Sequence, residues 1–379
     1  MRATLKLAGR GARVLMTADA VGSVWTYALD LGRGLAAAGL DVTLAVLGPP
    51  PDDAQAREAA GIDGLTVITT GLPLDWDLAL DAEAILFMGS EIAALAASRT
   101  VDLVHLHSPI LAASGNFPVP VVGGCHSCLA TWWHAVMGRA PLPASVAYRA
   151  DLLSEGYRRC RALIAPTRHF AMLTARRYGL GREPYVVHQG RPNPAIAATS
   201  EAERAVFTAG RLWDEGRNLA ALDRAARFID APIRAAGPVA SPEGKTVRLD
   251  RLELLGSIGA DEVARRLRGR PVFVSTALYE PFGLAAVEAA QAGCALVLSD
   301  IPSFRELWDG AARFVPAEDE RQIAAALRTL LEDPAERARA GAAAAERARA
   351  YSVERMVRRT MVVYREALSL PLTDEQAVA

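Results

Sequence analysis

The stretch YEPFGLAAVE at residues 279–288 decides the fold of this chain. The run PVFVS before it, at residues 271–275, is typical of a buried strand. The apolar residues after it have the pattern of a helix that runs to Gln291 and is terminated by Gly293. The stretch is therefore predicted to be a strand-to-helix turn, which is the repeating connection of a parallel α/β sheet. Glu280 lies in this turn, and Glu288 lies about two turns further along.

The two glutamates lie on either side of a helix N-terminus. The helical part of their separation spans about 8–10 Å, at about 1.5 Å per residue. Between them we expect the amide groups of Gly283, Leu284 and Ala285, which attract anions because a helix N-terminus carries partial positive charge and free donors. A sugar nucleotide has a matching order of groups. Glu280 would bind sugar hydroxyls, the helix end the diphosphate, and Glu288 the ribose diol.

A purely structural interpretation of the two glutamates stays open. One could be a partner of the helix dipole and the other a surface charge. The surroundings of Glu288 weaken this alternative, because its helix is otherwise apolar and a carboxylate there needs a partner.

Composition limits the protein to a few classes. A chain of 379 residues is too long for one ordinary core, so two domains are predicted. No apolar run reaches the roughly 18 residues that span a bilayer. A net charge of −1 gives no support for nucleic-acid binding. The N-terminus to Arg13 is basic without an apolar core, which predicts a disordered lead-in and not a signal peptide.

The four cysteines are too few for a disulfide-rich secreted protein and favour a cytoplasmic location. Cys125 and Cys128 form a Cys-x-x-Cys pair that invites a zinc or redox interpretation. A structural zinc site needs four ligands, and the chain has no second pair. Two small residues that close a strand are the favoured explanation.

Strand and helix patterns alternate along the whole chain. Continuous apolar strands between helices predict parallel sheets covered on both faces, and two series of strands predict two doubly wound α/β domains. The first series of predicted strands is 14–16, 42–46, 65–68, 103–106, 119–122 and 163–165. The second series is 186–187, 206–208, 233–235, 252–255, 272–274 and 295–298. Predicted helices include 25–38, 146–161, 219–228, 260–268 and a helical C-terminus over 321–368, in which 335–350 is expected to be a solvated face.

Ligands of such sheets bind beyond the carboxyl ends of the strands. Gly22 follows the first predicted strand, and it would let the backbone approach a phosphate or a sugar. His105 and His107 share one face at another strand end, where His105 is favoured as a core histidine. His126 follows a further strand and is a candidate site residue.

Arg211 and Arg217 lie in one predicted strand-to-helix loop. Guanidinium groups bind diphosphate oxygens and offset the charge of a leaving group. The alternative is a surface loop in which these arginines pair with Asp214 and Glu215.

Several motifs together resemble the retaining glycosyltransferases of family 4, which have the GT-B fold. The sequence Gly-Arg-Leu at 210–212 is followed by a basic residue before a helix, and Glu-Pro-Phe-Gly-Leu-x-x-x-Glu follows at 280–288. Further similarities are APT at 165–167, LG at 255–256, GCALVLS at 293–299 and REL at 305–307. The resemblance covers roughly residues 12–350 and is stronger in the C-terminal half.

The resemblance implies two Rossmann-like domains that face each other across a cleft. Residues 1–185 would form the acceptor-side domain, with a C-terminal helix at about 351–368 that crosses back to it. Residues 186–350 would bind the NDP-sugar. Transfer would retain the anomeric configuration and need neither a metal nor another cofactor.

The resemblance also implies roles for individual residues. Arg211 and Arg217 would hold the diphosphate, Glu280 the donor sugar and Glu288 the ribose. His126 would match the active-site histidine of the family, and the backbone near Ile258 would meet the base. None of the departures from the family pattern removes a carboxylate or a diphosphate cation: Arg217 replaces a lysine, Gly22 is a single glycine where many members have two, Gln189-Gly190 replaces Asn-Gly, and Ser275-Thr276 replaces Pro-Ser.

The acceptor side is less defined. Trp132 and Trp133 could stack on a sugar ring or anchor a helix, and His107 is a weak candidate. Asp75 and Asp77 resemble a metal-binding Asp-x-Asp, but an acceptor-side loop or a surface turn is favoured.

The identity of the substrates stays open at this stage. The donor is expected to be a UDP-, GDP-, ADP- or dTDP-sugar and the acceptor a glycan, a lipid-linked molecule or a small molecule. Any of these substrates is compatible with an enzyme that lies at the inner face of the membrane and makes peripheral contact with it. The alternatives are an NDP-sugar epimerase or hydrolase of the same fold and a catalytically silent GT-B subunit.

Overall fold

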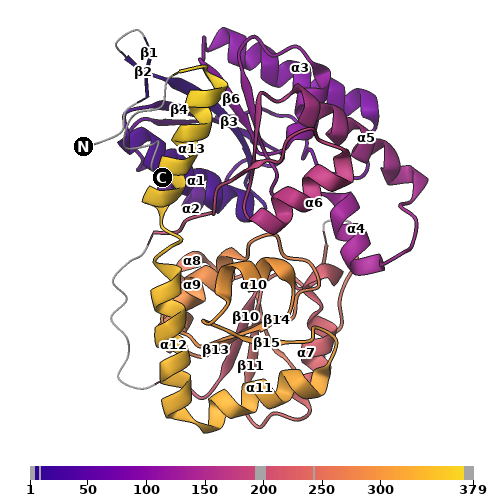
Figure 1. Cartoon of the computed structure of the whole chain (residues 1–379), viewed down its shortest axis with the longest axis vertical. Coiled ribbons are helices and arrows are strands. Elements are labelled where there is room, and N and C mark those ends of the chain that lie inside the picture. The colour runs from indigo at the N-terminus through magenta and orange to yellow at the C-terminus, as the bar shows by residue number, and fades with distance from the viewer. Residues whose placement is uncertain (1–4, 8–9, 193–201, 242–243, 371–379) are drawn as a thin grey trace. The chain divides into compact units, whose positions relative to one another are not determined.

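The computed structural model describes residues 5–7, 10–192, 202–241 and 244–370. The chain divides into two compact units. The first unit comprises residues 1–133, 139–192 and 353–379, and the second comprises residues 134–138 and 193–352 (Figure 1). Each unit is an α/β body with its own parallel sheet, so the prediction of two Rossmann-like domains is confirmed.

The first unit contains a seven-stranded parallel sheet of order β5-β4-β3-β6-β7-β8-β9. Its strands are β3 (Arg13–Asp19), β4 (Asp41–Leu47), β5 (Leu65–Thr69), β6 (Leu103–Leu106), β7 (Val121–Gly124), β8 (Ala162–Ala165) and β9 (Tyr185–Val186). Its helices are α1 (Ser23–Ala37), α2 (Asp53–Ala60), α3 (Ala82–Ser98), η1 (Pro109–Ser114), α4 (Leu129–Met137), α5 (Ala144–Arg159), α6 (Arg168–Tyr178) and α13 (Val353–Ala367). The last residues of α4 group with the second unit.

Helices cover both faces of this sheet. Leu15 of β3 packs with Ile85 and Met88 of α3 on one face. On the other face, α1 contacts β3 and β4, while α13 contacts β7 and β8. Because both faces are buried, the strands are continuously apolar and do not alternate between apolar and polar residues.

The second unit contains a six-stranded parallel sheet of order β12-β11-β10-β13-β14-β15. Its strands are β10 (Val206–Ala209), β11 (Ile233–Ala236), β12 (Glu253–Gly256), β13 (Val272–Ser275), β14 (Leu296–Ser299) and β15 (Arg313–Val315). Its helices are η2 (Glu215–Arg217), α7 (Leu219–Ala226), α8 (Ala260–Arg268), α9 (Leu284–Gln291), α10 (Pro302–Trp308), α11 (Glu320–Glu332) and α12 (Pro334–Ala348). Neighbouring residues of β13 face opposite cores: Phe273 packs with α9 and α10, and Val274 packs with α7 and α11.

The strand order of each sheet reverses at one point. In the first sheet the chain moves outward from β3 in one direction and then returns to continue from β6 in the other. In the second sheet the reversal lies between β10 and β13. At such a point the two following loops turn to opposite faces of the sheet, which leaves a crevice at its carboxyl edge.

Three expectations about strands were wrong in detail. The strand expected at 186–187 in the second series is β9, and it pairs with β8 in the first sheet. A two-residue edge strand carries no pattern that says which sheet it joins. The strand expected at 119–122 begins at Val121, because Pro120 has no N–H to donate to the ladder. The edge strand β15 was not predicted.

The described part of the N-terminus is ordered, which corrects the expected disordered lead-in. Short strands β1 (Lys6–Leu7) and β2 (Arg10–Gly11) pair antiparallel. Arg10 makes a two-pronged ion pair with Asp102, at 2.7 and 2.8 Å, and Leu5 is buried. These contacts join residues far apart in the sequence, so local composition did not reveal them.

Helix α12 is more than a solvated face, contrary to expectation. Its alanine- and arginine-rich sequence buries Arg337, Gly341 and Ala344. A Cβ added at Gly341 would lie 2.2 Å from the carbonyl oxygen of Gly293, at the end of α9. The helix therefore packs its small residues closely against backbone.

Helix α13 belongs to the first unit. Met356, Met361 and Tyr364 are almost fully buried. A Cβ added at Gly34 of α1 would lie 2.3 Å from a methyl group of Val357. The apolar face of α13 is thus seated against α1 and the sheet. Among the described residues, no helix is long and apolar enough to cross a membrane.

We predict that Gly341→Ala destabilises the second unit. The added methyl group would overlap the Gly293 carbonyl, and overpacking of this kind costs about 1–3 kcal/mol. Urea unfolding of the full chain should show a lower midpoint. The matched control is Gly181→Ala, where an added Cβ meets nothing within 4 Å. An unchanged midpoint for Gly341→Ala would contradict the close packing of α12 on α9.

Candidate active site

The predicted donor residues of the second unit gather at the carboxyl edge of its sheet. Arg211 and Arg217 follow β10, Ile258 follows β12, and Glu280 follows β13. Since β10 and β13 are neighbours, their two loops are adjacent although Arg217 and Glu280 are 63 residues apart. The fold therefore brings together the residues that sequence analysis selected in this half.

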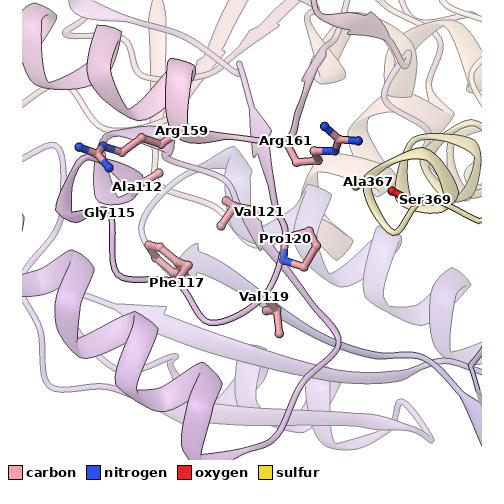
Figure 2. Close-up of a pocket in the computed structure, with 10 residues that line it drawn as sticks. All are labelled: Ala112, Gly115, Phe117, Val119, Pro120, Val121, Arg159, Arg161, Ala367 and Ser369. Atoms are coloured by element: carbon pink, nitrogen blue, oxygen red, sulfur yellow. The ribbon is translucent and has the colours of Figure 1, made fainter.

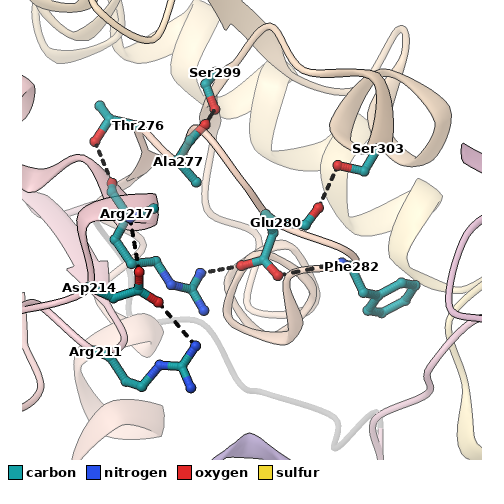
Figure 3. A network of polar contacts seen from close by, with 10 residues as sticks. Arg211, Asp214, Arg217, Thr276, Ala277, Glu280, Phe282, Ser299 and Ser303 are labelled. Carbon is teal, nitrogen blue, oxygen red and sulfur yellow. Dashed lines mark hydrogen bonds and ion pairs between the residues drawn. The ribbon is translucent and has the colours of Figure 1, made fainter. Parts of the chain in front are cut away.

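An ion pair joins the two loops. The guanidinium group of Arg217 binds the carboxylate of Glu280 (Figure 3). The side chain of Glu280 is 9% exposed and that of Arg217 is 24% exposed. At this burial the pair is only partly screened by water, so each group holds the other in a fixed position. In the surface-loop alternative the two arginines would pair with Asp214 and Glu215, but Glu215 pairs with Lys245.

Backbone contacts reinforce this pair. The amides of Leu278 and Tyr279 donate to the carbonyl oxygen of Gly216, at 2.8 and 3.3 Å. The hydroxyl of Thr276 donates to the carbonyl oxygens of Arg217 and Asn218, at 3.2 and 3.0 Å. The loop after β10 is therefore tied to the end of β13 at several points.

Arg211 is held differently from Arg217. Its Nη2 lies 3.1 Å from Asp214, whose other oxygen accepts from the amide of Gly216 at 2.9 Å. This agrees with the Asp214 half of the surface-loop alternative. The side chain of Arg211 is 54% exposed, so the ion pair is weak and leaves the guanidinium accessible.

The turn after β13 requires glycine. Gly283 is the N-cap of α9 and has φ of +91°, which is in the left-handed region. A Cβ there would lie 3.0 Å from the ring of Phe304 and 3.3 Å from Cγ of Glu280. The hydroxyl of Ser303 donates to the carbonyl oxygen of Glu280 (Figure 3). The turn thus fixes both the glutamate and the start of the helix.

The first turn of α9 follows directly. The amide of Ala286 donates to the carbonyl oxygen of Gly283, at 3.0 Å. Leu284 and Ala285, which precede Ala286 in this turn, are half-buried. Glu288 lies one turn into α9 and is half-buried between buried neighbours. Ile258 lies beyond the end of β12 and packs against the core beside α9.

Sequence analysis missed Gly237 in this half. It follows β11 with φ of +137°, and a Cβ there would lie 1.7 Å from the carbonyl oxygen of Gly210. The two loops touch backbone to backbone. A lone Gly-Pro in the sequence marks a turn but does not indicate what approaches it.

In the first unit, three histidines meet at the carboxyl edge of the sheet. His105 and His107 lie on one face of β6 and its extension, with ring centroids 4.6 Å apart. His126 follows β7, and its Nε2 lies 3.0 Å from Nδ1 of His107. The Tyr27 ring makes T-shaped contacts with the rings of both His107 and His126. His105 was favoured as a core residue, and it is fully buried.

Burial keeps these histidines neutral. It lowers the pKa of His126 to about 4 and that of His107 well below the ordinary value. Burial, with His126 nearby, lowers the pKa of His105 to about 3. Nδ1 of His105 also lies 2.7 Å from the hydroxyl of Tyr364 in α13. Sequence analysis missed Tyr27 and Tyr364, since each lies in a helix whose aromatic residues look like ordinary core.

Gly22 caps α1 with ordinary extended geometry, φ of −122°. The carboxylate of Asp19 accepts hydrogen bonds from the amides of Val21 and Gly22, both at 2.9 Å. A Cβ at Gly22 would meet only this carboxylate, at 3.6 Å. Glycine is therefore not required by the fold itself at this position.

The remaining predicted residues lie elsewhere in the first unit. The Trp132 and Trp133 rings are 6.3 Å apart on α4 and half-buried, and Trp133 donates to the carbonyl of Ala140. Asp75 lies in a turn, but its side chain is only 8% exposed, and burial raises its pKa to about 6. Arg149 donates to the carbonyl oxygen of Asp75.

The Cys-x-x-Cys pair consists of two buried thiols that are not joined in a disulfide. Burial raises the pKa of Cys125 well above its ordinary value, which suppresses the thiolate. Tyr178 donates to Cys128 at 3.2 Å. Among the described residues, no group of three or more histidine, cysteine or acidic side chains is arranged to hold a metal ion.

A pocket of about 310 Å³ lies at the opposite edge of the first sheet, where β7 and β8 begin. Phe117, Val119 and Pro120 form an apolar wall. Figure 2 shows Arg159 directed towards Gly115 and Arg161 directed towards the end of α13, in opposite directions. The two cations do not converge, so the pocket lacks the arrangement of an anion site.

Comparison with known proteins identifies both halves of the chain. The family described as Glycosyltransferase Family 4 matches residues 24–191, and the one described as Glycosyl transferases group 1 matches residues 245–347. A phosphatidyl-myo-inositol mannosyltransferase of Mycolicibacterium smegmatis is 38% identical over 183 residues, which cover 45% of this chain and 47% of that protein. A glycogen synthase of Mycobacterium tuberculosis is 26% identical over 374 residues, with 86% of each covered. The match to the mannosyltransferase thus spans about half of its length.

Solved structures share the fold. A sucrose-phosphate synthase from Thermosynechococcus elongatus has a TM-score of 0.77 at 18% identity, covering 94% of this chain and 99% of that one. HepE of Anabaena in complex with UDP-glucose has a TM-score of 0.72 at 16% identity, covering 93% and 99%. With the two parallel-sheet units and both family matches, the chain belongs to the family 4-like glycosyltransferases of the GT-B fold.

Proposed function

We propose that this enzyme transfers a sugar from an NDP-sugar to an acceptor with retention of anomeric configuration and without a metal ion. The observation that carries the proposal is the cluster at the carboxyl edge of the second sheet. Arg211, Arg217 and the start of α9 supply positive charge there, and Glu280 supplies a carboxylate that pairs with Arg217. This is the complement of a diphosphate joined to a neutral sugar.

In the proposed mechanism the two arginines hold the diphosphate. Arg217 carries five N–H donors, so it can keep a contact to Glu280 while it binds phosphate oxygens. A carboxylate at Glu280 accepts hydrogen bonds, which suits sugar hydroxyls. As the bond from the sugar to the diphosphate breaks, Arg211, Arg217 and the amides of α9 stabilise the charge that develops on the leaving group.

The acceptor would attack from the face that the diphosphate leaves, and a leaving oxygen would take the acceptor proton. His126 would stabilise the donor sugar or the positive charge that develops at its C1, which requires a neutral ring. Burial holds the pKa of His126 at about 4, in keeping with that role. Glu288 would bind the ribose diol, the backbone at Ile258 the base, and Gly22 the donor.

The relatives widen the choice of substrates. The names of the matched proteins include a mannosyltransferase and a glycogen synthase, and HepE was crystallised with UDP-glucose. We therefore propose a nucleotide-linked hexose as donor and a sugar, a glycan or a lipid-linked molecule as acceptor. His107, Trp132 and Trp133 remain candidates for the acceptor side. We also propose that the enzyme acts in the cytoplasm.

The function is tested by incubating the full chain with UDP-, GDP-, ADP- or dTDP-hexoses and an acceptor panel, with EDTA present. We expect one nucleotide series to raise the midpoint of thermal unfolding and to yield an α-linked product from an α-linked donor. Donor conversion that needs no acceptor would instead indicate an epimerase or hydrolase. Absence of nucleotide binding would indicate a silent subunit, and activity restored only by Mg²⁺ would contradict the metal-free mechanism.

Arg211→Ala and Arg217→Ala should each slow transfer. Loss of one charge-stabilising donor costs roughly 2–4 kcal/mol in the transition state. The effect should be larger for Arg217→Ala, since it also leaves the buried Glu280 without its cation. Steady-state kinetics with the NDP-sugar identified above provide the measurement, and Arg248→Ala, at a highly exposed arginine, is the control. Unaltered kinetics in both variants would refute the assignment.

Glu288→Gln should weaken donor binding and leave the fold intact. The amide keeps the size of the side chain but removes the charge that would accept hydrogen bonds from both ribose hydroxyls. Calorimetry should show a higher dissociation constant for the nucleoside diphosphate, while Glu346→Gln, at an exposed position of α12, should bind as the wild type does. Equal affinity in Glu288→Gln and the wild type would exclude the ribose role.

A further inference from the structure

Gln189 lies in the segment that follows β9, and its side chain contacts His126. The side-chain nitrogen of Gln189 lies 3.2 Å from Nδ1 of His126. Gln189 is 9% exposed. In the sequence it marked only a departure from the usual Asn-Gly, and nothing there indicated a partner.

The backbone around Gln189 is held on both sides. The amide of Val187 donates to the carbonyl oxygen of Ala165, at 2.9 Å. The amide of Gly190 lies 3.3 Å from the sulfur of Met356 in α13. Arg191 makes an ion pair with Asp30 of α1. A side chain that leaves a segment anchored this closely can direct its amide group at one atom.

The chemistry of the amide group determines where the proton of His126 lies. An amide N–H can only donate, so Nδ1 of His126 must be the acceptor and carry no hydrogen. The neutral ring then carries its hydrogen at Nε2, which lies 3.0 Å from Nδ1 of His107. His107 accepts this hydrogen bond and in turn carries its own hydrogen at Nε2.

We infer that Gln189 and His107 are positioning residues that hold His126 as the neutral tautomer protonated at Nε2. The two contacts occupy both ring nitrogens, and a T-shaped contact with Tyr27 holds the plane of the ring. This inference rests on the proposed function, in which His126 approaches the donor sugar. When the NDP-sugar is bound, the Nε2–H group of His126 would stop donating to His107 and donate to an oxygen of the sugar instead. The histidine would then donate one hydrogen bond in a defined direction.

The tautomer can be observed without any substrate. Long-range ¹H–¹⁵N NMR of the full chain labelled at histidine distinguishes a protonated from an unprotonated ring nitrogen. The six histidines can be separated because His126→Asn removes one set of signals. At neutral pH we expect His126 to show hydrogen at Nε2 and none at Nδ1. Hydrogen at Nδ1, or an even mixture of the two forms, would overturn the inference.

Gln189→Glu tests the cause of this preference. A carboxylate at the same place only accepts, so hydrogen should move to Nδ1 of His126 or the ring should become an imidazolium. Gln55→Glu is the matched control. It makes the same change in charge within the first unit, and its side-chain oxygen can keep the capping contact to Asp52. The control should show wild-type histidine signals. Retention of the Nε2–H form in Gln189→Glu would overturn the role of Gln189.

Gln189→Met covers the case in which the glutamate variant does not fold. It removes the donor without adding a charge, and we expect the single tautomer to become a mixture. A variant that keeps the pure Nε2–H form would be evidence against the inference. For His107, His107→Asn offers an amide that can still accept, and should preserve the tautomer better than His107→Leu.

Kinetics separate this inference from the proposed function. Gln189→Glu should lower kcat by about tenfold or more, the scale found for partners that orient a working imidazole. The dissociation constant of the nucleoside diphosphate should not change, because Arg211, Arg217 and Glu288, which are proposed to hold it, are in the second unit. A normal kcat would overturn the positioning role in catalysis. If the wild-type chain transfers no sugar, the proposed function fails, whereas the NMR result still decides the tautomer.

Discussion

The ion pair between Arg217 and Glu280 is the interaction on which the rest of the second unit's site depends. It joins the loops that follow β10 and β13, and it places a cation and a carboxylate side by side at low exposure. Neither group would be stable there alone, since a buried charge without a partner loses far more hydration than the protein returns. The surrounding contacts, from Thr276, Ser303 and the amides of Leu278 and Tyr279, all hold the backbone that carries this pair.

The first unit uses a different device at the corresponding edge of its sheet. Its site residues are neutral rings whose charge burial suppresses, and their order is maintained by hydrogen bonds and ring edges. Helix α13 contributes Tyr364 to this group, although it comes from the far end of the chain. A charged cluster in one unit and a neutral cluster in the other suit different tasks. In the proposed function, the charged cluster of the second unit would stabilise a diphosphate, and the neutral cluster of the first unit would present directed hydrogen bonds without attracting an anion of its own.

Much of the fold could be predicted because the strands and helices of a parallel α/β sheet each have a recognisable local sequence pattern. Continuous apolar runs such as that of β13 are bounded by turns, and each is followed by a helix with an apolar face. The helix α9 was predicted to run to Gln291, and it ends there. The expectations that failed concern elements without such a pattern. The edge strand β9 has two residues, β15 has three, and the N-terminal strands are held by the contact of Arg10 with Asp102.

The sequence by itself determined which groups can do chemistry: two carboxylates around a helix start, two arginines in one loop and a histidine after a strand. Their types and spacing are local properties, and loops at strand ends follow from the alternation of strand and helix. Tertiary structure alone decided the partners. Three contacts depend on the order of strands in each sheet and on the packing of distant segments. They are the pair of Arg217 with Glu280, the contact of Gln189 with His126, and the close packing of Gly341 in α12 against the end of α9. Such contacts leave no period or motif in the sequence, because the atoms that meet are chosen by packing and not by neighbourhood along the chain.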